Sequence, residues 1–135
     1  MDTAVLTLQI VTGDARPIFR QIVDGISLLV IKGELVPGNR LPSVRALAQQ
    51  LLVNPNTVAK AYTELTKMGY LESRKGLGIF VVERRQILSD DERKKRLDQA
   101  IEAFIHEVLP LDLPMADILS KLAAQLKDVT QTKDH

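Results

Sequence analysis

Apolar residues recur at helical spacing in three segments of the first half of the chain. In the first segment, residues 17–33, isoleucine and leucine return every three or four positions, and a glycine follows the last of them. A second stripe covers residues 43–53 and a third covers residues 54–69. The pattern predicts three amphipathic helices, the first of which has Pro17 at its first position.

The sequences between these stripes predict turns and helix caps. Pro37-Gly38 suits a type II turn, and Ser43 is placed to cap the second helix. Asn54-Pro55 ends the second helix and starts the third, because proline is tolerated in the first turn of a helix but not in its interior. The second and third helices are so close in sequence that they must cross sharply, as in a helix-turn-helix. The residues expected to face the core from these two helices are Val44, Leu47, Ala48, Leu51, Val58, Tyr62 and Leu65.

Two other segments have the composition of β-strands. Residues 5–10, VLTLQI, predict a short strand before the first helix. Residues 70–82 contain two β-prone runs around the basic, glycine-containing sequence RKGLG at residues 74–78, which predicts a β-hairpin. A hairpin that directly follows a helix-turn-helix has the position of a wing.

Two further amphipathic stripes follow a charge-rich linker at residues 83–90. One runs from about Asp91 to Val108, and the other starts near Pro114. A two-helix hairpin cannot enclose so many apolar side chains, and a large exposed apolar surface usually marks an interface. We therefore expect these helices to pack against a second copy of the chain, the alternative being that they dock on the preceding domain. The expected interface residues are Leu97, Ile101, Phe104, Ile105, Leu119, Leu122 and Leu126.

Length and composition narrow the class of protein. The 135 residues suffice for one core and a small appendage, and 45% hydrophobic with 26% charged residues is ordinary for a soluble domain. The absence of cysteine excludes disulfides, thiolate zinc sites and a cysteine nucleophile, and it suits a reducing compartment. No apolar leader and no apolar run of about 20 residues is present, so we expect a cytoplasmic protein without a membrane partner.

The charge is unevenly distributed along the chain. Residues 1–82 carry nine Lys/Arg against six Asp/Glu, a net charge of +3, whereas residues 83–135 carry nine against eleven, a net charge of −2. A basic N-terminal half is mildly suited to nucleic acid, although scattered surface charges can give the same count.

Neither the histidines nor the acidic cluster suggests an enzyme or a metal centre. His106 lies on a charged helix and His135 at the end of the chain, without a nearby nucleophile or a partner at ligand spacing. The acidic residues 90–92 are better explained by a helix N-terminus, whose dipole they complement. We therefore expect no catalytic residue, no metal and no cofactor.

The segments PIFRQIVDGI and GELVPGNRLPSVRALAQQLLVNPNTVAKAYTELTKMGYLESRKGLGIFV together resemble the winged helix-turn-helix of the GntR superfamily over about residues 17–82. The resemblance implies a mostly α fold with a small β-wing, as a DNA-binding domain at residues 1–82, a linker at 83–90 and a helical dimerisation tail at 91–135. About fifty residues are too few for the effector domains of larger members. The chain is similar in this respect to the YtrA-like subfamily, which has only two tail helices.

The resemblance also places candidate DNA contacts on the sequence. A recognition helix enters the major groove by its N-terminal turns, where Asn56, Thr57 and Lys60 could reach adenine, thymine and guanine respectively. The alternative for Asn54 and Asn56 is that they only cap the helix. The resemblance implies further contacts from the second helix and from the wing, so the candidates are Arg45, Asn54, Asn56, Thr57, Lys60, Arg74, Lys75 and Gly76.

These observations predict a dimer that binds double-stranded operator DNA sequence-specifically and represses its own operon. The YtrA-like resemblance implies that neighbouring transporter genes are among its targets. One alternative is a winged-helix module that binds proteins without specific DNA binding, and another is a small enzyme. The sequence identifies no small-molecule effector.

Overall fold

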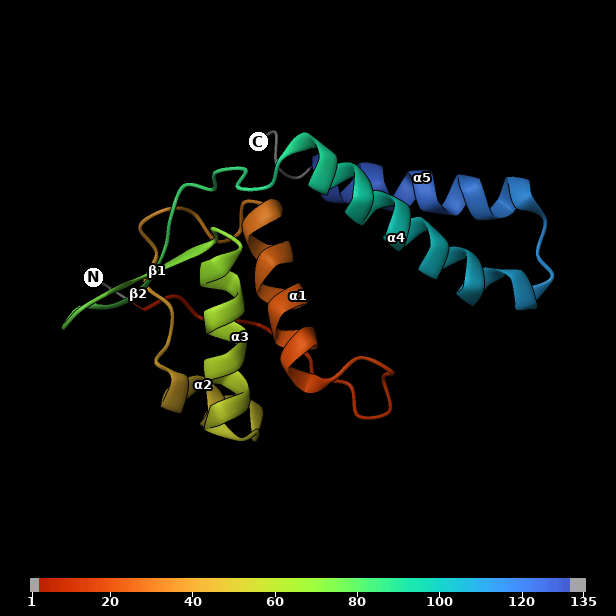
Figure 1. The fold of residues 1–135 in the computed structure, drawn as a ribbon. Coiled ribbons are helices and arrows are strands. Elements are labelled where there is room, and N and C mark those ends of the chain that lie inside the picture. Colours follow the sequence, from red (N-terminus) through yellow and green to blue (C-terminus); the bar gives the residue numbers. More distant parts are fainter. Residues whose placement is uncertain (1–2, 132–135) are drawn as a thin grey trace. The chain divides into compact units, whose positions relative to one another are not determined.

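The computed structural model describes residues 3–131, and the chain divides into two compact units between Arg85 and Gln86. The first unit contains three helices and a two-stranded antiparallel sheet, and the second contains two long helices (Figure 1). This confirms the mostly helical fold with a small β-wing. Every buried residue of the described chain belongs to the first unit, which therefore has a core of its own.

The helices of the first unit are α1 (Ile18–Ile31), α2 (Val44–Leu51) and α3 (Pro55–Lys67), and α3 packs against both others. The expected start of α1 was one residue early, because Pro17 is its N-cap. The predicted cap of α2 is confirmed, since the Ser43 hydroxyl oxygen accepts a hydrogen bond from the backbone N–H of Ala46 at 3.0 Å. The expected core positions are buried or half-buried, and they meet residues of α1 and of the hairpin: Ile22, Val23, Ile26, Leu47, Ala48, Val58, Ala61, Tyr62, Leu65, Leu71 and Val81.

The wing consists of β1 (Leu71–Arg74) and β2 (Gly78–Val81). Arg74 pairs with Gly78 at the end of the ladder, so the turn itself is shorter than the five-residue tip that the sequence suggested. Gly76 and Gly78 both have positive φ angles, of 76° and 122°, which explains the glycines here. The hairpin is anchored to the rest of the unit by Arg40, which forms an isolated bridge with Phe80.

The expected strand at residues 5–10 does not form. Residues 4–11 are an extended arm whose even-numbered side chains face inward, but no neighbouring strand pairs along them. Side-chain amides take the place of that strand: Gln50 Nε2 donates to the Leu6 carbonyl at 2.7 Å, and the Gln21 amide both accepts from and donates to Val11. Alternating hydrophobicity therefore predicted the extended backbone correctly but not its partner.

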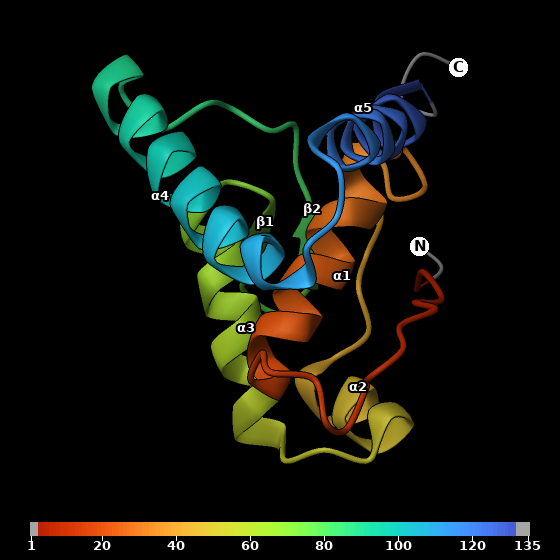
Figure 2. The same ribbon diagram turned by 90° about the vertical axis from the view of Figure 1, so that its right-hand side faces the viewer.

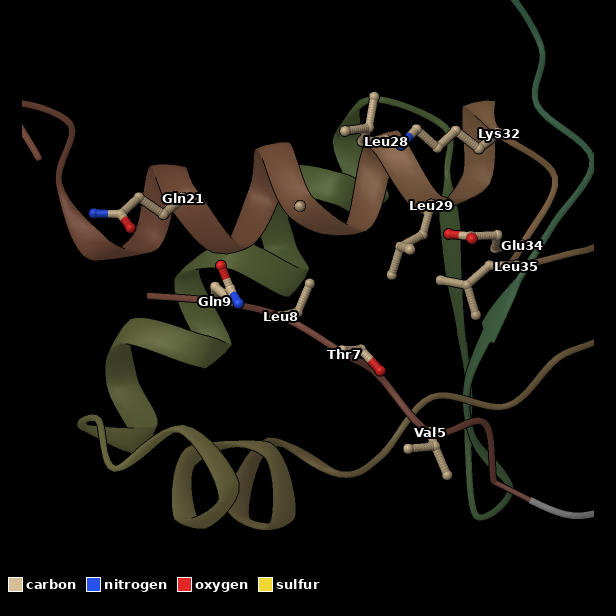
Figure 3. A pocket seen from close by; sticks show the side chains of 11 residues that line it. Val5, Thr7, Leu8, Gln9, Gln21, Leu28, Leu29, Lys32, Glu34 and Leu35 are labelled. Carbon is tan, nitrogen blue, oxygen red and sulfur yellow. The ribbon is translucent and has the colours of Figure 1, made fainter. Parts of the chain in front are cut away.

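The arm runs beside α1, and the two enclose an open groove of ≈ 710 Å³ (Figure 3). Leu8 points from the arm toward α1. It packs where α1 has Gly25, and a Cβ at that position would lie 2.8 Å from Leu8 Cδ2. A glycine inside the helix thus lets the arm approach α1 closely.

The turn between α2 and α3 contains a strained leucine. Leu52 has φ 57° and ψ 46°, a left-handed conformation that disfavours a side chain, and it is 91% exposed. Leu52→Gly should therefore raise the free energy of unfolding by about 0.5–1 kcal/mol, since relief of strain exceeds the added chain entropy of glycine. Urea denaturation would measure this, with Leu52→Ala as the control that keeps the strain. Equal stability of the two variants would show that Leu52 is not strained.

The second unit contains α4 (Asp90–Val108), a 3₁₀ turn (Leu109–Leu111) and α5 (Met115–Gln131). The Ser89 hydroxyl oxygen caps α4 by accepting from the backbone N–H of Glu92 at 3.2 Å, and acidic residues occupy its first turn. The two helices diverge from the turn that joins them (Figure 2). No helix in the described part of the chain is both long and apolar enough to cross a membrane.

None of the described side chains of this tail is buried. The seven expected interface residues are between 37% and 60% exposed in the single chain. A groove of ≈ 770 Å³ lies between α4 and α5, with Phe104 and Leu122 among its lining residues. Leu119 and Leu126 do not line it, so α5 also presents apolar side chains that α4 leaves uncovered.

Candidate nucleic-acid interface

The N-terminal turn of α3 separates the roles of its two asparagines. Asn54 is the N-cap, and its Oδ1 accepts a hydrogen bond from the backbone N–H of Asn56 at 2.8 Å. The Asn56 side chain is exposed and has no hydrogen-bond partner among the residues that the structure describes. The amide of Asn56 is therefore available for a base edge, whereas that of Asn54 is occupied by capping. Thr57 follows, half-buried, in the same turn.

Tyr62 fixes the position of α3 relative to the segment that precedes α2. It is 3% exposed, and its hydroxyl donates a hydrogen bond to the Pro42 carbonyl oxygen at 2.7 Å. Burial raises the pKa of the Tyr62 hydroxyl well above its ordinary value, so the group keeps its proton and remains a donor. The expectation that Tyr62 belongs to the core is confirmed.

Arg45 lies on the first turn of α2 and is exposed. Neither Arg45 nor Lys75, at the tip of the wing, forms an ion pair with a carboxylate within the described residues. A Cβ at Gly76 would meet no atom within 4 Å, which leaves the backbone of the tip open to a ligand. These groups have the exposure that a phosphate contact needs.

Arg74 is held against its own hairpin. Its Nε lies 3.0 Å from Glu72 Oε2, and its guanidinium carbon lies 4.6 Å from the centroid of the Phe80 ring. Sequence reasoning did not identify this pair, although residues two apart on a strand share a face. This ion pair uses only Nε, so it leaves the Nη1 and Nη2 donors of Arg74 unoccupied.

Lys60 is also engaged within the protein. Its Nζ lies 3.8 Å from the centroid of the Phe19 ring on α1, and the guanidinium carbon of Arg20 lies 5.2 Å from the same centroid. Sequence reasoning missed Phe19 and Arg20, because the contact joins residues about forty positions apart.

Among the described residues, no group of three or more His, Asp or Glu could hold a metal ion.

Comparison with known proteins gives a consistent picture. A family model described as bacterial regulatory proteins, gntR family, matches residues 19–81. The chain is 37% identical to the uncharacterized HTH-type transcriptional regulator YhcF of Bacillus subtilis, over 78% of this chain and 86% of that protein. It is 32% identical to the HTH-type transcriptional repressor YtrA of the same organism, over 91% of this chain and 92% of the repressor.

A solved structure extends the similarity to the tail. The crystal structure of a transcriptional antiterminator from Listeria monocytogenes superposes with a TM-score of 0.78 at 29% identity. The match covers 96% of this chain and 95% of the Listeria chain, so it includes both units of the fold.

Proposed function

Because the chain belongs to the GntR family of bacterial regulatory proteins, we propose that it is a dimeric repressor that occupies an operator at its own promoter. It is a winged helix-turn-helix, DNA-binding transcription regulator of the YtrA-like type, and regulators of this family bind operator DNA. The repressor YtrA, similar over nearly its whole length, supports repression as the outcome. Transporter genes beside its own gene are the targets we propose.

The relatives do not support the alternatives that the sequence left open. They are named as transcription regulators, which are not enzymes, and not as protein-interaction modules. The function is thus sequence-specific regulation of transcription. The proposals below concern the assembly of the protein, its DNA contacts and its targets.

The exposed tail is the observation that supports the dimer. The described tail buries no side chain of its own, and its apolar stripes are too large for a solvent-facing surface. Two copies packed through Leu97, Ile101, Phe104, Ile105, Leu119, Leu122 and Leu126 would cover them. Two-fold symmetry would then present two α3 helices to a two-fold operator, with residues 83–90 as the linker and half-sites about one helical turn, roughly 34 Å, or a multiple of it apart.

The division of labour that we propose follows from the geometry of the first unit. Asn56 and Thr57 read base edges, while Arg45 and Lys75 contact phosphates. Arg74 joins them through the guanidinium nitrogens that Glu72 does not engage, and Gly76 lets the backbone of the wing approach the DNA. Asn54 holds the first turn of α3 in place.

Binding should be strongly salt-dependent. Arg45, Lys60, Arg74 and Lys75, doubled in a dimer, would supply about six to eight phosphate contacts, so the slope of log K against log salt should be roughly −5 to −7. Footprinting on the promoter of its own gene would locate the operator, and fluorescence anisotropy on that duplex would give the slope. A flat salt dependence, or no protected site, would contradict the proposed function.

A further inference from the structure

Two cations from different helices gather on one aromatic ring beside the N-terminal half of α3. Lys60 of α3 and Arg20 of α1 lie on the ring of Phe19, at 3.8 and 5.2 Å from its centroid. Both distances are within the range of cation–π attraction. The ring itself is half-buried and packs against the hydrophobic core, which fixes its position. We call Phe19, Arg20 and Lys60 the cation seat.

Neither cation forms an ion pair with the carboxylate that stands four residues later in its own helix. Asp24 stands four residues after Arg20, a spacing that favours an ion pair, but its Oδ2 accepts from Arg16 Nη1 at 2.7 Å. Glu64 stands four residues after Lys60, whose ammonium group lies on Phe19 instead. Within residues 3–131, no ion pair is formed by Arg20 or Lys60.

Two like charges on one ring attract an anion because their positive potentials add, and among the described residues no carboxylate forms an ion pair with either. The cation seat lies where DNA would supply an anion. The N-terminal ends of α1 and α3 lie at the same end of the first unit (Figures 1 and 2), and α1 packs along α3. Lys60 is one helical turn beyond Asn56, which we propose as a base-reading residue. A recognition helix in the major groove has backbone phosphates on both flanks.

We propose that the cation seat binds a backbone phosphate of the DNA, with Arg20 as a contact from α1 and Phe19 as the residue that positions Lys60. Lys60 is then a sequence-independent contact and not a reader of guanine. This inference rests on the proposed function, since it assumes that α3 enters the major groove.

The test uses the full-length protein, the operator duplex and a random-sequence duplex of equal length in fluorescence anisotropy at several salt concentrations. Arg20→Ala and Lys60→Ala should each weaken binding to both duplexes by about 3- to 10-fold and flatten the salt dependence, and the double variant should reduce the salt slope by about 2, the loss of one phosphate contact per chain of a dimer. Lys32→Ala, at the opposite end of α1, is the matched control and should change neither.

Phe19 is tested through its effect on Lys60. Phe19→Leu should weaken binding to both duplexes in the otherwise unchanged protein, but add little when Lys60 is already alanine. Phe19→Tyr keeps an aromatic face and should retain wild-type binding. Thermal unfolding of the Phe19 variants would separate a loss of fold from a loss of positioning. The variants at the half-buried Arg20 and the exposed Lys60 test the seat outside the hydrophobic core.

The outcomes distinguish a failure of the cation seat from a failure of the proposed function. Unchanged affinity and slope for Arg20→Ala, alongside weaker binding for Arg45→Ala, would overturn the seat while leaving DNA binding intact. A loss for Lys60→Ala on the operator alone would make Lys60 a base reader and likewise overturn the seat. If the unmodified protein bound neither duplex, the proposed function itself would fail.

Discussion

Removal of the tail is expected to yield a folded monomer that has lost most of its operator affinity. A chain that ends at Arg85 keeps every buried residue of the described structure, so its circular dichroism should remain that of a folded winged domain. If the tail forms the proposed dimer, its removal takes away the effective concentration at which the second half-site would be bound. The operator affinity should fall by about 100-fold or more. Light scattering and anisotropy would measure the two effects.

A single charged substitution in the tail should also prevent dimerisation of the full-length chain. Leu119 is 57% exposed and does not line the groove between α4 and α5, so Leu119→Glu costs the isolated chain little. In a dimer it would bury an unpaired carboxylate, which is strongly unfavourable. Lys127→Gln makes the same change in net charge on another face of α5 and should leave the dimer intact. Dimerisation of the Glu variant, or a monomeric wild type at tens of micromolar, would show that the tail is not the interface.

Asn56→Ala is expected to cost about 1–3 kcal/mol, or roughly 5- to 150-fold, on the operator and little on random DNA. The reason is that its amide is exposed and unpartnered in the described structure, whereas Asn54 already caps α3. Anisotropy on the two duplexes would measure the difference.

Asn54→Ala is the matched control, because it removes the cap and should lower the free energy of unfolding by about 1 kcal/mol. Asn56→Ala should leave that free energy nearly unchanged. Equal losses on both duplexes, or a stability loss as large as that of Asn54→Ala, would return Asn56 to a structural role.

The parts of the fold that sequence predicted are those set by local chemistry. Ser43 and Asn54 cap their helices through their own side chains, and a positive φ at Gly33 and Gly69 follows the ends of α1 and α3. The family model and the relatives confirm the winged helix-turn-helix that these signals predicted. Helix starts were therefore correct to about one residue, whereas α2 ends at Leu51, two residues before the expected end.

What the sequence could not predict depends on contacts between distant segments. The arm is extended without a partner strand, and Gln21 and Gln50 form hydrogen bonds with its backbone at Val11 and Leu6, which no pattern within the arm indicates. The placement of Lys60 depends on Phe19 in the same way, through the packing of α1 against α3. Side-chain direction, more than secondary structure, was the missing information.

Because no described side chain of the tail is buried, the concentration of the protein would affect how strongly it represses its own synthesis. If a chain acquires a partner only through side chains that it leaves uncovered when alone, the share of dimers depends on how many copies the cell contains. At low copy number, the population of dimers rises with the square of the number of chains. Occupancy of the operator would then rise more steeply than synthesis, and a repressor of its own gene would silence itself over a narrow range of expression.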